Sequence, residues 1–154
     1  MENRPQTEIR LMVLFGILQQ LMTTRQNKLF THLELTPSQF GVLNHFTHKP
    51  ERSWMVTELA EVMEMNQPGI TKIVNVLIDK KLLVAEPDKA DRRKRHLKIT
   101  DQGLNTCKNT LQSLLPDISH IFEQWQDDDL SELQLHLEKL MTWLDNHRED
   151  IKRV

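Results

Sequence analysis

The sequence predicts a mainly α-helical protein that contains a helix-turn-helix followed by a short β-hairpin. Two capped helical segments lie only two residues apart in the middle of the chain, and an alternating apolar and polar stretch follows them. Apolar residues with a period of about 3.5 residues fill the last third, which is typical of a helix–helix seam. With 154 residues, of which 38% are apolar, the chain is long enough for one domain with a core of its own.

Composition excludes several other classes of protein. No apolar run approaches the roughly 18–20 residues of a membrane span, and the polar, mixed-charge N-terminus is unlike a secretory signal. The single cysteine rules out an internal disulfide framework and suits a reducing compartment. We therefore expect a cytoplasmic protein with no membrane partner.

The first helix is expected over residues 8–31, where apolar side chains occupy much of the helical circumference and call for two packing partners. A second, shorter helix is expected from Thr36 to about His48. Thr36 is its N-cap, Pro37 occupies the first helical position and Gln39 closes a capping box.

The helix-turn-helix is predicted over residues 57–80. Thr57 is expected to cap its first helix and Asn66 its second, with Pro68 in the first turn of the second helix. In that second helix, the spacing of Ile70, Val74 and Leu77 predicts a buried face. Thr71, Lys72 and Asn75 project from the other side.

A β-hairpin is predicted from strands at residues 82–86 and 95–100, and a brief strand is expected at residues 53–55. Alternation points Leu97 and Ile99 inward, whereas Lys94, His96 and Lys98 point outward. Residues 88–100 hold six Lys or Arg and two Asp, although the whole chain has a formal charge of −2. The positive charge is therefore concentrated on this hairpin, after which Thr100 is expected to cap another helix.

The last third contains the most regular apolar spacing in the chain. Pro116 is expected to kink the first of its two helices without ending it, and residues 127–129, all Asp, suit the start of the second. The dimerisation seam is predicted at Leu104, Leu111, Ile118, Leu133, Leu137 and Leu140. A homodimer built from both chain ends is the economical explanation, and the alternative is a monomer that folds its ends onto itself.

Residues 56–103 resemble the winged helix-turn-helix of MarR-type transcriptional regulators. The most specific stretch, DRRKRHLKIT, fits the family pattern Asp-x-Arg-x-x-x-Leu-x-x-Thr at Asp91, Arg93, Leu97 and Thr100. The stretch LTPSQFGVLNHF resembles the family's second helix, and the helical ends fit its dimerisation region. One departure is Lys81, which stands where a Gly usually follows the recognition helix; a left-handed Lys there costs about 1 kcal/mol.

The resemblance implies a single MarR-like domain over residues 1–154, of which residues 35–100 form the DNA-binding lobe. Residues 7–32 and 101–150 form the helical dimerisation region. It further implies a homodimeric regulator of double-stranded DNA, usually a repressor, that is released by a small-molecule effector or an oxidant. It implies no intrinsic cofactor and does not name the effector.

The residues themselves support contact with DNA. A capped helix N-terminus offers free N–H groups to phosphate, and Gln, Asn and Lys side chains can read bases in a major groove. The recognition-helix contacts are predicted to be Gln67, Gly69, Thr71, Lys72 and Asn75, with Gly69 allowing close backbone approach. A solvated polar helix face is the alternative.

The predicted hairpin tip carries Arg92, Arg93, Lys94 and Arg95, which can reach an adjacent minor groove; Arg is attracted to a narrow A·T-rich groove. The family pattern favours Arg93 for this insertion and implies that Asp91 orients an arginine. The alternative is a charged loop that only aids solubility.

Other candidate sites are weaker. Cys107 falls within the apolar seam, which favours a structural role over redox sensing. His45 and His48, with His32 nearby, lack the ligand pattern of a zinc site, so no metal is predicted. The three Trp residues, 54, 125 and 143, either line an effector pocket or pack in cores.

No enzyme active site is predicted, because the sequence has no nucleophile–base pair at a turn, no Gly-rich phosphate loop and no metal triad. A winged-helix protein-interaction adaptor without DNA binding is the alternative function.

Overall fold

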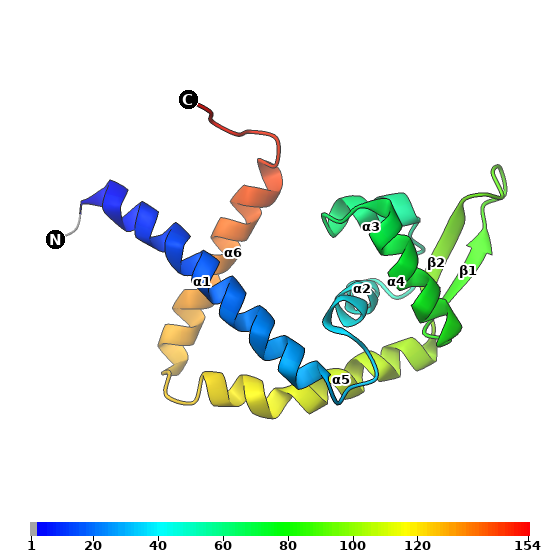
Figure 1. The fold of residues 1–154 in the computed structure, drawn as a ribbon, viewed down its shortest axis with the longest axis horizontal. Coiled ribbons are helices and arrows are strands. Elements are labelled where there is room, and N and C mark those ends of the chain that lie inside the picture. The colour runs from blue at the N-terminus through cyan, green and yellow to red at the C-terminus, as the bar shows by residue number, and fades with distance from the viewer. Residues whose placement is uncertain (1–2) are drawn as a thin grey trace. The chain divides into compact units, whose positions relative to one another are not determined.

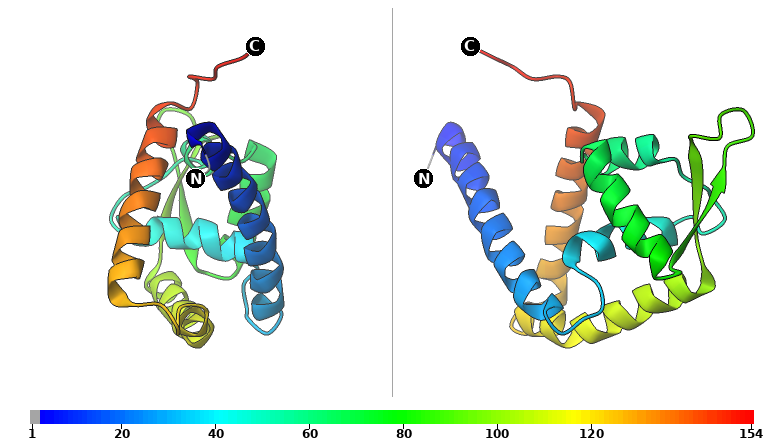
Figure 2. Two further views of the ribbon diagram at one scale, coloured as in Figure 1. Left: turned by 90° about the vertical axis from the view of Figure 1, so that its left-hand side faces the viewer. Right: turned by 45° about the vertical axis from the view of Figure 1, so that its right-hand side comes forward.

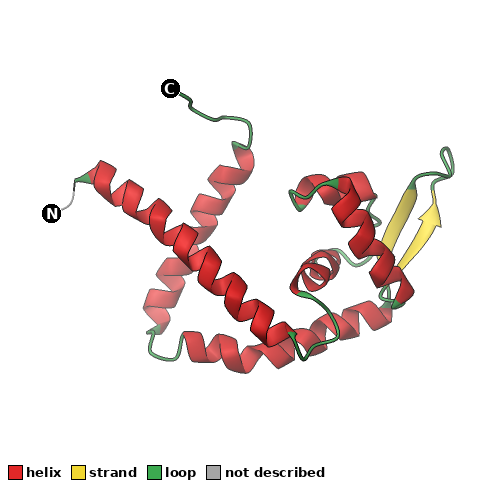
Figure 3. Ribbon diagram, in the orientation of Figure 1, coloured by secondary structure: helices red, strands yellow, loops and turns green. Residues whose placement is uncertain are grey.

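The structure is a computed structural model that describes residues 3–154, and these form six helices and one two-stranded sheet (Figures 1 and 3). It divides into two compact units, one ending at Leu114 and the other comprising Leu115–Val154. In chain order the elements are α1 (Arg4–Phe30), α2 (Pro37–Thr47), α3 (Val56–Val62), α4 (Gln67–Asp79), β1 (Leu83–Pro87), β2 (Arg95–Ile99), α5 (Asp101–Ile121) and α6 (Asp127–Asn146).

The core of the first unit is formed by α2, α3, α4, the hairpin and the start of α5. Phe46 of α2, Leu59 of α3, Val74 of α4 and Leu97 of β2 are completely buried in it. The predicted inward residues Ile70, Val74 and Leu77 are all in this core, which confirms the buried face expected for the second helix of the helix-turn-helix. The hairpin loop projects beyond these helices (Figures 1 and 2).

Three of the predicted helix caps are present. The Thr36 hydroxyl accepts from the Gln39 N–H, and the Gln39 side chain accepts from the Thr36 N–H in a reciprocal capping box. The Asn66 carboxamide accepts from the Gly69 N–H at 2.7 Å. The Thr100 hydroxyl accepts from the Gly103 N–H at 3.0 Å at the start of α5. Each cap acts over three residues, which is why the local sequence predicts it.

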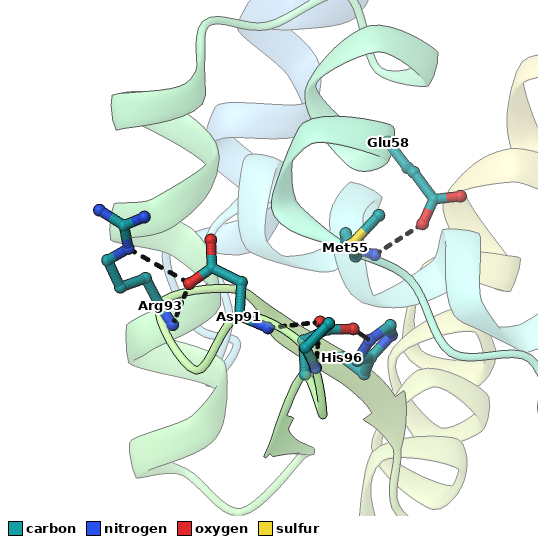
Figure 4. Close-up of polar contacts among 7 residues, drawn as sticks. Met55, Glu58, Asp91, Arg93 and His96 are labelled. Carbon is teal, nitrogen blue, oxygen red and sulfur yellow. Dashed lines mark hydrogen bonds and ion pairs between the residues drawn. The ribbon is translucent and has the colours of Figure 1, made fainter.

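The predicted Thr57 cap is wrong, because α3 already begins at Val56. The residue at the N-cap position is Met55, whose side chain offers no oxygen. Instead, the Glu58 carboxylate reaches back and accepts from the Met55 N–H at 3.0 Å (Figure 4). The Glu58 half of a capping box is thus present without its usual polar N-cap partner.

Both helices of the helix-turn-helix end in the left-handed backbone conformation without glycine. Glu64 has φ = 51° and Lys81 has φ = 61°. At the end of α4 the Lys81 N–H donates to the Ile78 carbonyl and the Leu82 N–H to the Leu77 carbonyl. These two bonds define a Schellman motif, so Lys81 occupies the position that favours glycine. Where the family pattern has glycine, this chain therefore has a lysine in a strained left-handed conformation.

The hairpin is antiparallel and pairs Leu83 with Ile99 and Ala85 with Leu97. Its first strand lies one residue later than the sequence predicts, at Leu83–Pro87, and the second ends at Ile99. The brief strand expected at residues 53–55 is reduced to a single bridge, in which Trp54 and Leu97 exchange backbone hydrogen bonds of 2.9 and 2.8 Å.

Helix α5 continues through Pro116 to Ile121, as the unbroken apolar period predicts. Its first turn packs closely on the sheet: a Cβ at Gly103 would lie 2.3 Å from the Leu82 carbonyl oxygen and 2.7 Å from Ile99 Cγ1. Glycine is therefore required at this crossing. Cys107, further along, is buried in the same core.

Large apolar side chains remain exposed on α1, on the later part of α5 and on α6, and α6 has no buried residue at all. The apolar N-terminal helix α1 begins at Arg4, earlier than predicted, and Phe30 is its only buried residue. No helix within residues 3–154 combines the length and the apolar character that a bilayer crossing needs.

Candidate nucleic-acid interface

The solvent face of α4 carries the residues predicted to read bases. Gln67, Lys72 and Asn75 are exposed, and Thr71 is half-buried. Their common helix begins at the Asn66 cap, so the positive end of its dipole lies at this end of the face. The face is polar throughout and suits hydrogen bonding to base edges or phosphate.

Gly69 has a local role that the sequence prediction missed. A Cβ at this position would lie 2.9 Å from the Asn66 Oδ1 that caps the helix. The absent side chain therefore leaves room for the cap. The predicted close approach of the backbone to DNA stays a prediction.

The hairpin tip presents basic side chains to solvent. Arg92, Arg93 and Lys94 are exposed, and 92% of the Arg93 side chain is accessible. Arg95 differs from them because it begins β2, at the base of the loop, and is half-buried. The predicted set of four basic residues thus separates into a tip of three and a base of one.

Asp91 contacts Arg93, as the family pattern implies. One carboxylate oxygen of Asp91 accepts from both the N–H and the Nε–H of Arg93, at 3.1 and 3.2 Å (Figure 4). The Nη groups of Arg93 extend beyond the carboxylate in this view. An exposed ion pair of this kind contributes little stability, and its main effect is to restrict where the guanidinium lies.

Asp88 organises the loop, and sequence reasoning did not single it out. Its Oδ2 accepts from the N–H groups of Ala90 and Asp91, at 3.0 and 2.9 Å. Its Oδ1 lies 2.6 Å from Nε2 of His96 on the opposite strand. The His96 bond, followed by the two backbone bonds, lowers the pKa of Asp88 to about 2. The sequence signal that could have indicated this role is an Asp at the start of a loop, where its side chain commonly accepts from the backbone two residues further on in an Asx-turn.

A hydrogen bond joins the recognition helix to the hairpin. Nη2 of Arg95 donates to Oδ1 of Asn75 at 3.1 Å, across twenty positions of sequence. The sequence predicted both residues as separate DNA contacts, one in each element. The structure brings them together.

The residues considered for other chemistry show no sign of a second reactive or metal-binding site within residues 3–154. Burial raises the pKa of the Cys107 thiol to about 11, which makes it a poor nucleophile and fits the structural role expected for it. Within residues 3–154 no group of three or more His, Cys, Asp or Glu side chains is arranged to hold a metal ion. Trp54 is buried in the first unit, with His45 packed edge-on against it and Arg52 stacked over its ring.

The predicted seam residues differ in accessibility. Leu111, Ile118, Leu137 and Leu140 are 37–45% exposed, whereas Leu133 is half-buried. Leu104 packs against the core of the first unit, because the first turns of α5 lie on the sheet. It is therefore less available to a partner than the sequence predicts.

Comparison with known proteins finds one family model that matches part of the chain. The model of the MarR family matches residues 33–94, which span α2, the helix-turn-helix, β1 and the hairpin tip. A protein of Thauera aromatica, described as a transcriptional regulator for the hcr operon, is 30% identical over 81 residues. That match spans 53% of this chain and about half, 48%, of the relative's length.

Solved structures share the fold at low sequence identity. A MarR family protein from Bacillus stearothermophilus is similar over 94% of this chain and 99% of its own, with a TM-score of 0.77 and 17% identity. The regulator BldR from Sulfolobus solfataricus covers 92% and 99%, with a TM-score of 0.76 and 22% identity. A mutant MarR from E. coli, solved with operator DNA, covers 90% and 99%, with a TM-score of 0.69 and 21% identity.

Proposed function

We propose that the chain is a member of the MarR family, and that it is a transcriptional regulator that binds double-stranded DNA through α4 and the hairpin. MarR family proteins are DNA-binding regulators and not enzymes, and the E. coli relative has been solved on operator DNA. In the proposed complex α4 enters a major groove, and the hairpin acts as a wing that reaches the adjacent minor groove.

The observation that carries this proposal is the exposed basic tip beside a capped, polar helix face. Residues 88–100 contribute a net charge of +4 in a chain whose total is −2, so the remainder sums to −6. A surface of this kind attracts DNA at one place and repels it elsewhere, which orients docking. The interaction-adaptor alternative gives no reason for such charge segregation.

We also propose that the regulator is a homodimer that recognises a pseudo-palindromic site. The exposed apolar side chains of α1, α5 and α6 support this, because a second copy that covers them removes apolar surface from water. A dimer places its two recognition helices in successive major grooves about one helical turn apart. Binding to a site that overlaps a promoter represses transcription in the cytoplasm, and an effector that prefers another spacing of the two lobes releases the DNA.

The test is binding of the purified protein to the DNA upstream of its own coding sequence, followed by fluorescence anisotropy at about 50 and 200 mM salt. We expect tight, sequence-preferring binding by a dimer that weakens as salt rises. Arg93→Ala is expected to weaken binding and reduce its salt dependence. Lys72→Ala and Gln67→Ala are expected in addition to relax the base preference.

Lys139→Ala is the matched control, since it removes one exposed positive charge from α6, outside the proposed interface. It is expected to leave affinity and salt dependence unchanged. Equal affinity of Arg93→Ala and the unchanged protein would contradict the role of the wing. Weak binding that is the same for every sequence, also among fragments selected from genomic DNA, would favour the adaptor alternative.

A further inference from the structure

Arg95 occupies a special place among the basic residues of the wing. Alternate residues of a strand face the same side, so Arg95 shares a side of β2 with Leu97 and Ile99. Both of these are buried in the core cluster that also contains Val74 of α4. Arg95 therefore lies on the same side of β2 as these two residues, just beyond the edge of the core. Its guanidinium contacts α4 at Asn75, the residue that follows Val74.

The hydrogen bond formed there limits what Asn75 can do. Bidentate reading of adenine requires the carboxamide oxygen and nitrogen to face one base together. Here the oxygen accepts from Arg95 Nη2 at 3.1 Å, so the carboxamide is turned toward the wing. A base-reading role, as the sequence predicts for Asn75, requires this bond to give way.

The chemistry of the partner matters as well. Arg93 is held by the anionic carboxylate of Asp91, which offsets part of its charge. Asn75 is neutral, so Arg95 is held in place while its full positive charge and its other N–H donors stay available. A fixed, unneutralised guanidinium is well suited to bidentate contact with phosphate.

We propose that Asn75 is a positioning residue that holds Arg95 against the DNA backbone between the two grooves. This inference rests on the proposed function: if α4 lies in a major groove and the wing in the adjacent minor groove, the sugar-phosphate strand that separates the grooves passes between them. Arg95 lies at that junction and contacts a phosphate. Asn75 acts through Arg95 and reads no base.

The test is a double-mutant cycle on DNA binding with Asn75→Ala, Arg95→Ala and the double variant. Affinity is measured across a salt series and on operators that carry every single base-pair substitution. Arg95→Ala is expected to weaken binding about tenfold per protomer and to reduce the slope of log K against log salt by about 0.9 per protomer, or about 1.8 per dimer. Asn75→Ala is expected to weaken binding by a smaller factor, with an unchanged base-preference profile.

The decisive result is the coupling between the two sites. If Asn75 acts through Arg95, the double variant binds no more weakly than Arg95→Ala alone. Lys139→Ala is again the control, because it removes an exposed positive charge that lies outside residues 88–100; its salt slope is expected to equal that of the unchanged protein. Lys72→Ala is the positive control for relaxed base preference.

Additive losses, or base preference relaxed at one position by Asn75→Ala, would overturn the inference while leaving the proposed function intact. A salt slope unaltered by Arg95→Ala would do the same. Absence of salt-sensitive, sequence-preferring binding by the unchanged protein would overturn the proposed function, and this inference with it. Asn75 is exposed and Arg95 half-buried at the surface, and circular dichroism of each variant checks that the lobe is folded.

Discussion

Replacing Lys81 by glycine is expected to stabilise the protein. Lys81 has φ = 61° at the end of α4, and a non-glycine residue in the left-handed region costs about 1–2 kcal/mol. Glycine removes that strain but adds conformational entropy to the unfolded chain, which offsets about 0.5–1 kcal/mol. At the middle of these two ranges the net gain in the free energy of unfolding is about 0.75 kcal/mol, or a rise in Tm of about 1.5–3 °C for a chain of this size.

Urea denaturation measures this difference, with all variants at one protein concentration because the proposed dimerisation would be linked to folding. Lys80→Gly is the matched control, since Lys80 is the preceding residue and has φ = −78°. Glycine relieves no strain there and is expected to destabilise the protein by about 0.5–1 kcal/mol. Opposite signs at neighbouring lysines are the signature of the left-handed position. A Lys81→Gly variant that is no more stable than the unchanged protein would refute this reasoning.

Three further predictions concern the same lobe. Gly103→Ala is expected to destabilise the lobe by more than about 2 kcal/mol in urea denaturation, because the added Cβ would lie 2.3 Å from the Leu82 carbonyl oxygen. Gly41→Ala is the control and is expected to be tolerated, because a Cβ at Gly41 would meet no atom within 4 Å. Burial, with the nearby charges of His48 and Arg52, lowers the pKa of His45 below its ordinary 6.5. The free energy of unfolding should therefore fall as the pH drops below about 6.5, and His45→Phe should reduce that fall. A pH profile of stability that is the same in His45→Phe and the unchanged protein would contradict this prediction. The pKa of Asp88 is lowered to about 2, so its contribution to the free energy of unfolding is present above its ordinary pKa of 3.8 and is lost as the pH falls toward 2. The difference in stability between Asp88→Asn and the unchanged protein should therefore close over that range. A difference that stays constant would speak against the His96 bond.

The sequence predicted the features that depend on near neighbours. The caps at Thr36, Asn66 and Thr100 each join residues three apart, so their residue types suffice. The start of α3 could not be predicted in this way, because its cap comes from Glu58 reaching backward and not from the residue at the N-cap. Most of the fold follows from such local signals and from apolar periodicity.

The candidate site was predicted by residue and not by arrangement. Gln67, Lys72 and the three tip residues lie exposed on the expected elements, and Asp91 contacts Arg93 as the family pattern implies. The bonds Asn75–Arg95 and Asp88–His96 were not predicted, because they join residues twenty and eight positions apart. Such pairs depend on how strands and helices pack against one another, whereas the sequence predicted only the bounds of the strands, with β1 one residue earlier than observed.

In the proposed DNA complex, the Asn75–Arg95 bond has a consequence for how sequence specificity can evolve. Gln67 and Lys72 point into solvent, so mutation can exchange them and alter the preferred sequence without disturbing the wing. Asn75 offers no such freedom, because a new side chain there also releases Arg95 from its place. Drift toward a new operator is therefore expected to begin in the first turns of α4, and changes at positions 75 and 95 are expected to occur together.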